Sequence, residues 1–249
     1  MKKLFSTIIC CLICSTAFMQ VKPEWQDETT PFVGKEYPRT AFMTYSDVSK
    51  ARNNDFSTSA NYKSLNGKWK FNWVPTYKKR PVNFYTTDFD DSSWGEIEVP
   101  ANWETNGYGV ALYTNHPYEF CPRNPQPPLL PEENPVGSYR RYIEIPEQWN
   151  GKEIFLHIAV KSGCYLYVNG KKVGYGEDSK AAVEYNITRY LKPGRNLIAL
   201  EVYRWTTGSY LECQDFWRIS GIERDVYLFA QSPVYLRDFA ISQDLDNTY

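Results

Sequence analysis

The chain has 249 residues and a formal net charge of -1, and 42% of its residues are hydrophobic. That length suits one large all-β domain or two small ones, and the near-neutral charge excludes both a basic nucleic-acid-binding surface and attraction to an anionic membrane. Aromatic residues make up 16% of the sequence, with 20 Tyr and 8 Trp, which favours strands and leaves some rings for a binding surface.

The N-terminus has the pattern of a targeting segment. Lys2 and Lys3 precede an apolar run over residues 4–17, which ends in small residues suited to cleavage. The run is too short to cross a membrane comfortably. We therefore predict a signal peptide over residues 1–20 and an exported, periplasmic protein with no membrane span.

The six cysteines fall into two groups. Three lie in the predicted signal peptide: Cys10, Cys11 and Cys14. They leave a lipoprotein anchor as an alternative, which is disfavoured because no small residue precedes any of them. The other three are Cys121, Cys164 and Cys213. Their spacing matches no zinc pattern, and their odd number leaves one thiol free or paired elsewhere. We expect Cys213 to be a small buried residue.

Residues 21–61 are predicted to form an extended arm, since they contain Pro23, Pro31 and Pro38 and show little periodicity. Two placements are open for this arm. It either folds over the next domain or reaches a neighbouring subunit.

Strand patterns begin at residue 62. Asn66-Gly67 is a turn signal, and Trp69, Phe71 and Trp73 then alternate as in a strand with one buried face. Further on, a run with five prolines between residues 122 and 131 predicts an ordered loop, because proline removes backbone donors and stiffens the chain.

The second half of the chain carries short strands at regular intervals. Apolar residues alternate over 154–160 and over 164–168, and Asn169-Gly170 between this strand and the next is a strong hairpin signal. Lys192-Pro193-Gly194 predicts another turn. No long stretch has helical periodicity. We therefore predict an all-β jelly-roll sandwich over residues 62–231.

The segment 204–228 has the highest density of aromatic and charged residues that could form a binding site. It reads RWTTGSYLECQDFWRISGIERDVYL. Apolar strands are predicted on both sides of it, and loops held by rigid strands commonly carry binding groups. Aromatic faces with a few fixed polar groups are a common lining of small-molecule sites.

Six segments resemble the sugar-binding domain of the β-galactosidases of glycoside hydrolase family 2. The most specific is DFWRISGIERDV at residues 215–226. The others are LNGKWKF at 65–71, DFDDSSW at 88–94, VPANW at 99–103, YTNHPY at 113–118 and ENPVGSYRR at 133–141. The resemblance covers about residues 65–228 and implies a galactose-binding-like β-sandwich.

The resemblance implies the N-terminal part of a β-galactosidase, which hydrolyses terminal non-reducing β-D-galactose residues in β-galactosides. The catalytic glutamates of the family lie in a later β/α barrel, and no strand–helix alternation here could build one. We therefore expect no catalytic residue in this chain. Glu212 and Asp215 are close in sequence, but we do not expect them to be the two carboxyl groups that glycoside hydrolysis needs.

Residues 232–249 resemble the first strand of the immunoglobulin-like domain that follows in the family. A lone strand cannot pair its ladder groups or bury its faces. The sequence is therefore expected to stop within that domain.

By resemblance, Asp215 contacts galactose hydroxyls and helps to hold a sodium ion, and Asn115 reaches the galactose from the YTNHPY segment. A carboxylate can accept sugar hydroxyls while binding a hard cation, and an amide can donate and accept at once. The alternatives are that Asp215 caps a turn and that Asn115 bonds its own backbone. Where the family has an acid, Cys213 stands two residues before Asp215. A magnesium ion is expected in the barrel domain.

The other polar candidates have simpler explanations. His157 is predicted to be a structural histidine in a strand, whereas His116 borders the candidate asparagine and could line the site. Arg204, Trp205 and Arg218 are expected to brace the loop through stacking and ion pairs.

Two further functions remain open: a free-standing carbohydrate-binding module, and another family 2 glycosidase such as a glucuronidase or mannosidase. The YTNHPY and ECQDFWRISGI segments favour the β-galactosidase. The implied partners are a galactoside, the immunoglobulin-like and barrel domains of the same polypeptide, and further copies of the chain in a homo-oligomer.

Overall fold

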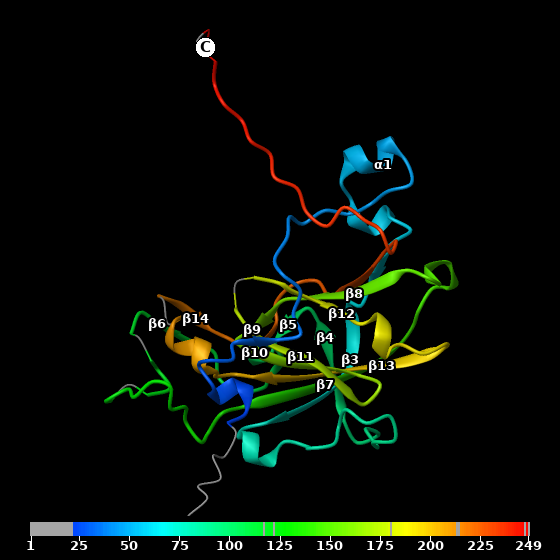
Figure 1. Cartoon of the computed structure of the whole chain (residues 1–249). Coiled ribbons are helices and arrows are strands. Elements are labelled where there is room, and N and C mark those ends of the chain that lie inside the picture. Colours follow the sequence, from blue (N-terminus) through cyan, green and yellow to red (C-terminus); the bar gives the residue numbers. More distant parts are fainter. Residues whose placement is uncertain are drawn as a thin grey trace, which may run out of the picture.

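The fold is a sandwich of two main antiparallel sheets, as predicted (Figure 1). It is seen in a computed structural model that describes residues 22–116, 118–121, 123–179, 181–212, 215–246 and 248. The predicted signal peptide lies outside the described residues. The larger sheet has the strand order β1-β11-β10-β13-β7-β3-β4, and the smaller one has the order β12-β8-β16-β2.

The larger sheet contains β1 (Phe32–Val33), β3 (Gly67–Val74), β4 (Gly95–Val99), β7 (Val136–Glu144), β10 (Gly163–Val168), β11 (Lys171–Glu177) and β13 (Arg195–Tyr203). The smaller sheet contains β2 (Tyr62–Ser64), β8 (Glu153–Ile158), β12 (Val183–Asn186) and β16 (Tyr227–Gln231). A three-stranded sheet joins β5 (Ala101–Asn102), β15 (Gly221–Ile222) and β9 (Val160–Lys161), and a two-stranded sheet joins β6 (Leu112–Thr114) and β14 (Phe216–Arg218).

Helical segments in the described residues are short. They are α1 (Val48–Asn53) and the 3-10 turns η1 (Glu24–Gln26), η2 (Phe56–Thr58), η3 (Tyr77–Lys79), η4 (Glu104–Asn106), η5 (Glu147–Trp149), η6 (Thr188–Tyr190) and η7 (Thr207–Tyr210). Within the same residues, no helix is long and apolar enough to span a membrane.

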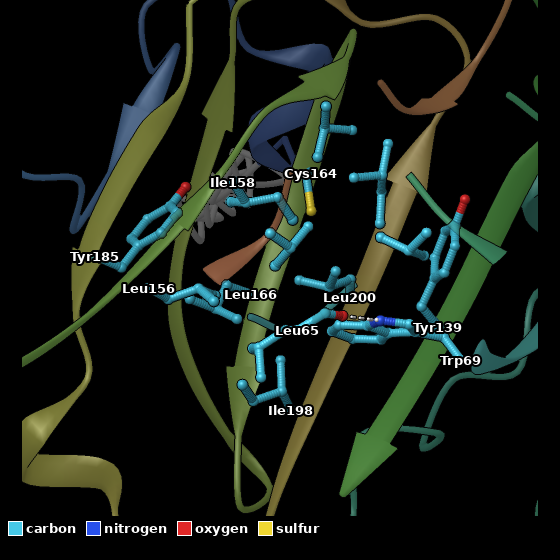
Figure 2. Packing of buried hydrophobic residues seen from close by; sticks show 14 of the residues in the cluster. Leu65, Trp69, Tyr139, Leu156, Ile158, Cys164, Leu166, Tyr185, Ile198 and Leu200 are labelled. Atoms are coloured by element: carbon cyan, nitrogen blue, oxygen red, sulfur yellow. Dashed lines mark hydrogen bonds between the residues drawn. The ribbon is translucent and has the colours of Figure 1, made fainter. Parts of the chain in front are cut away.

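The core lies between the two main sheets (Figure 2). Trp69 and Leu200 from the larger sheet and Leu156 from the smaller one are almost completely buried. The Trp69 indole N–H donates to the carbonyl oxygen of Leu65 at 2.9 Å, so the large ring is buried without an unpaired polar atom. A fully buried apolar side chain of this size contributes about 1.5–3 kcal/mol, which makes this layer the main source of stability.

The predicted turns form where glycine and asparagine allow a left-handed backbone. Asn169 (φ 50°) and Gly170 (φ 83°) connect β10 to β11, and Gly194 (φ 76°) precedes β13. The predicted strand over residues 154–160 is split, because β8 ends at Ile158 and β9 pairs in a different sheet.

The N-terminal arm folds over the sandwich and is less extended than predicted. Trp25 of η1 is buried, and its ring stacks on Tyr203 with centroids 4.7 Å apart. Further along, β1 adds a strand to the edge of the larger sheet by pairing with β11. Met43 then packs in a cluster with Phe155 and Phe229 of the smaller sheet.

The segment after β16 forms no strand within the described residues up to 246. It has no partner for a strand ladder there, and its first part instead contacts the arm. The Thr40 amide donates to Asp238 at 2.9 Å, and the rings of Phe42 and Phe239 lie 5.4 Å apart. Beyond these contacts the segment leads away from the sandwich (Figure 1). Its assignment to an immunoglobulin-like domain stays a prediction.

Candidate functional site

The strands β6 and β14 form a two-stranded ribbon beside the main sheets (Figure 1). In its antiparallel register Phe216 faces Thr114 and Trp217 faces Tyr113. Asn115 directly follows β6 and Asp215 directly precedes β14, so both residues adjoin the paired strands at the same end of the ribbon. The structure thus brings the two predicted site residues together from distant parts of the sequence.

Two exposed aromatic residues of this ribbon share one face, and the two predicted sugar-binding residues adjoin it. Side chains two residues apart on a strand point to the same face, and directly opposed residues share a face. Tyr113 and Trp217 share a face by this rule, and the hydrogen bond from Tyr113 to Asp215 puts Asp215 beside them; we call these three residues and the adjoining Asn115 the ribbon face. All four are exposed, with Tyr113 at 56% and Trp217 at 53%. Neither Asn115 nor Asp215 is sealed in the core.

Within the ribbon face, the Tyr113 hydroxyl donates a hydrogen bond of 2.7 Å to Oδ1 of Asp215. The Tyr113 and Trp217 rings lie 5.7 Å apart at an angle of 60°. The bond to the Asp215 carboxylate, together with its charge, raises the pKa of Tyr113. The sequence analysis did not single out these two aromatics. The signal in the sequence that could have identified them is their spacing, since each lies two residues from Asn115 or Asp215.

Arg204 connects the ribbon to neighbouring segments through hydrogen bonds and an ion pair. Its Nη2 donates to the carbonyl oxygens of Val110 at 3.1 Å and Arg218 at 3.2 Å, one on each side of the ribbon. Its Nη1 lies 3.2 Å from Oε1 of Glu104, whose side chain has no exposed surface. Glu104 also accepts from the amide (2.8 Å) and hydroxyl (3.0 Å) of Ser220. Burial lowers the pKa of Arg204, against the opposing effect of nearby carboxylates.

A second buried ion pair braces the same region. Nε of Arg218 lies 3.0 Å from Oε2 of Glu119, and the two side chains are only 4% and 6% exposed. The Arg204 guanidinium lies over the Trp205 ring at 4.9 Å, and that ring packs against Phe120 at 5.0 Å. The predicted bracing role of Arg204, Trp205 and Arg218 is confirmed. Buried charges need such partners, because desolvation of an unpaired ion is costly.

The remaining polar candidates belong to other contacts. Both carboxylate oxygens of Glu212 are bonded by Ser179, through its amide at 2.6 Å and through its hydroxyl. The Glu212 carboxylate is therefore bonded to the loop that contains Ser179 and is not on the ribbon face. His157 is structural, as predicted, with Nδ1 3.1 Å from Glu184 Oε1. His116 is exposed next to the ribbon face, and its amide donates to the hydroxyl two residues before it at 2.9 Å.

The described cysteines are Cys121, which is half-buried, and Cys164, which is buried; both are free thiols. Burial raises the pKa of the Cys164 thiol well above its ordinary range. Cys164 is thus a small buried residue, whereas Cys213, for which burial was predicted, lies outside the described residues.

A small cavity next to Arg218 of β14 is lined in part by Arg204 and Trp205 as well. Its free volume of about 20 Å³ is close to the room that one water needs. A hexose does not fit there.

Asp215 can supply one oxygen to a cation but not a complete coordination sphere. Tyr113 occupies Oδ1, which leaves Oδ2 as a ligand atom. In the described part of the chain, no three His, Cys, Asp or Glu residues gather in a way that could hold a metal ion. The residues fit a sodium site only if other oxygen ligands complete it.

The comparisons with known proteins agree with this fold. The family model described as "Glycosyl hydrolases family 2, sugar binding domain" matches residues 62–232. The chain belongs to glycoside hydrolase family 2. The match covers both main sheets except β1, and it includes both strands of the ribbon.

Curated relatives named β-galactosidase are similar over most of this chain. A β-galactosidase of Priestia megaterium is 39% identical over 91% of the chain, and one of Halalkalibacterium halodurans is 41% identical over 74% of it. The matched regions are 22% and 18% of those proteins. The chain therefore spans about a fifth of the length of its relatives.

Solved structures of two β-glucuronidases share the fold. A β-glucuronidase of Bacteroides uniformis superposes with a TM-score of 0.52 at 29% identity, over 69% of this chain and 18% of that one. A β-glucuronidase of an uncultured Clostridium gives the same TM-score at 16% identity, over 75% and 31%, and shows the fold alone.

Proposed function

We propose that this chain is the N-terminal part of a β-galactosidase, which hydrolyses terminal non-reducing β-D-galactose residues in lactose-type β-galactosides. The observation that carries the proposal is the position of Asn115 and Asp215, which adjoin the same end of the ribbon and are both exposed. Two buried ion pairs hold that ribbon in place, and the similarity to β-galactosidases covers it.

In this function the ribbon face binds and orients the sugar. The Asp215 carboxylate accepts hydrogen bonds from sugar hydroxyls, and the Asn115 amide donates and accepts. The exposed ring of Trp217 offers an apolar face to the sugar C–H groups. Such contacts accelerate hydrolysis to the extent that they strengthen in the transition state.

Bond cleavage belongs to another part of the polypeptide in this proposal. Glycoside hydrolysis needs two carboxyl groups placed across the scissile bond. Glu212 and Asp215 are not such a pair, since Glu212 is bonded to Ser179. The catalytic glutamates, and the magnesium ion expected near them, would lie in the β/α barrel domain.

A sodium ion would supply a fixed positive charge for sugar hydroxyls. Asp215 would hold it through Oδ2, with further oxygen ligands from the rest of the polypeptide. The protein's own contribution is the exposed carboxylate and the ribbon that fixes its place.

The proposal predicts that Asp215→Ala severely impairs the full-length enzyme. Two hydrogen bonds to a charged group contribute about 1.5–3 kcal/mol each, so kcat/KM for a β-galactoside should fall about 100-fold or more. The measurement is steady-state hydrolysis of a chromogenic β-galactoside. Asp244→Ala, which removes an exposed carboxylate far along the C-terminal segment, should leave kcat/KM unchanged. Wild-type kcat/KM in Asp215→Ala would remove this residue from the site.

Two other functions are tested by the same proteins. Because the solved family members include β-glucuronidases, the full-length enzyme should be assayed on matched galactoside and glucuronide substrates. Preference for the glucuronide would replace the proposed substrate. A free-standing binding module would show galactose binding by the 249-residue chain alone in calorimetric titration.

We further propose that the protein is exported to the periplasm and assembles as a homo-oligomer. Residues 2–17 support export because they combine a basic start with a short apolar run. Cell fractionation should find the protein outside the cytoplasm, and light scattering of the full-length enzyme should give a multiple of the monomer mass.

A further inference from the structure

We propose that Tyr113 is a positioning residue for Asp215, whose hydroxyl holds one carboxylate oxygen so that the other is presented to the sugar. This inference rests on the proposed function and deepens it. It is carried by the 2.7 Å hydrogen bond from Tyr113 to Oδ1 of Asp215 and by the shared face of the ribbon.

An exposed aspartate needs help to hold one orientation. Asp215 lies just outside β14, and the residues around it do not bury its side chain. Ordering a free side chain costs conformational entropy, which would otherwise be lost when the sugar binds. A partner that fixes the carboxylate beforehand lowers that cost.

Tyr113 is built for this role because it is itself fixed. It lies in the middle of β6, directly opposite Trp217 in β14. The two rings contact each other at 5.7 Å in a tilted arrangement, which limits movement of the phenol. Tyrosine also has few rotatable bonds, so a hydroxyl at its end is well placed at low entropic cost.

The hydrogen bond leaves the chemistry of the carboxylate intact. An ionised carboxylate accepts at both oxygens, and Tyr113 is bonded to Oδ1 only. Oδ2 and the second lone pair of Oδ1 are left to accept sugar hydroxyls and to bind a cation. Since the same bond raises the pKa of Tyr113, the phenol stays protonated and keeps donating throughout the neutral range.

The test is Tyr113→Phe in the full-length enzyme, which removes the hydroxyl and keeps the ring beside Trp217. We expect kcat/KM for a β-galactoside to fall about tenfold, the size of one charged hydrogen bond at its lower limit. The loss should appear in the same parameter, kcat or KM, that Asp215→Ala changes most. The matched control is Tyr37→Phe, at a tyrosine of the N-terminal arm that is 83% exposed, and it should change neither kcat nor KM.

The double variant separates positioning from direct sugar contact. If Tyr113 acts through Asp215, adding Tyr113→Phe to Asp215→Ala should cause no further loss. An equal additional loss in that background, or wild-type kinetics in Tyr113→Phe alone, would overturn the inference. In either case a damaged Asp215→Ala enzyme would leave the proposed function standing. An undamaged Asp215→Ala enzyme would overturn both.

Discussion

Gly137 shows how strongly a single residue is constrained in this fold. It lies in β7 against two rings of the core. A methyl group added there would lie 2.4 Å from Cζ2 of Trp103 and 2.9 Å from Cε2 of Phe71. Trp103 is completely buried and cannot move away without displacing other core residues.

We predict that Gly137→Ala destabilises the protein by about 1–3 kcal/mol, the usual cost of overpacking a core. Urea unfolding followed by tryptophan fluorescence measures this change. Gly95→Ala is the matched control, since the nearest atom to its added methyl group is an ordinary 3.6 Å away, and it should have almost no destabilising effect. Equal unfolding midpoints for the two variants would contradict the packing argument.

Local signals made some residues predictable and left others hidden. Asn169-Gly170 was identified because the turn depends on those two residues alone. The need for glycine at 137 depends on Trp103, more than thirty positions earlier, and no local pattern carries that information. Asn115 and Asp215 were found only through a family resemblance, because nothing in their immediate neighbourhoods says that they meet.

At the scale of elements, the ribbon β6–β14 depends on the buried pair of Glu104 and Arg204. We predict that Glu104→Gln destabilises the protein by about 3–5 kcal/mol, because it leaves the Arg204 charge buried without its partner. The measurement is urea unfolding of the purified protein. The matched control is Glu96→Gln, whose ion pair with Lys68 is largely exposed and should contribute about 1 kcal/mol or less.

An equal effect of Glu104→Gln and Glu96→Gln would show that the buried pair does not stabilise the ribbon. A milder outcome is also informative. If Glu104→Gln unfolds only slightly earlier but loses galactoside hydrolysis in the full-length enzyme, the pair acts mainly by aligning the ribbon.

The strands β3 and β10 were predicted from alternating apolar residues and follow those predictions closely, whereas the pattern over residues 154–160 is divided between β8 and β9. The two strands of the ribbon were not predicted and were treated as loops. Each has only three residues, which is too short for a period to show, and each pairs with a segment about a hundred positions away. The sandwich could therefore be predicted from the sequence, whereas the geometry of the candidate site could not.

At the scale of the whole molecule, the arm is attached to the smaller sheet through Glu184. Arg39 of the arm donates to both oxygens of this carboxylate, at 2.8 and 2.9 Å, and His157 contacts it at 3.1 Å. Burial by itself would raise the pKa of Glu184. The hydrogen bonds from His157 and Arg39, with the charge of Arg39, outweigh burial and lower it below its ordinary value.

A lowered pKa means that the folded state favours the ionised carboxylate of Glu184. Its contribution to stability is complete above the ordinary value of 4.5 and is lost as the pH falls through the folded pKa. We predict that the free energy of unfolding falls from about pH 5 toward pH 3, and that it falls less steeply in Glu184→Gln. Urea unfolding across this range tests it. Glu147→Gln, an exposed control, should keep the wild-type slope, and identical slopes in all three proteins would contradict the prediction.

The hydrogen bond between Tyr113 and Asp215 joins positions that are 102 residues apart. A nascent polypeptide leaving the ribosome therefore carries β6 long before its partner strand has been made. All seven strands of the larger sheet are synthesised by Tyr203, ahead of Asp215. Sugar binding would consequently be one of the last properties that the growing domain acquires. A product terminated shortly after Tyr203 would contain that entire sheet and would not bind galactose.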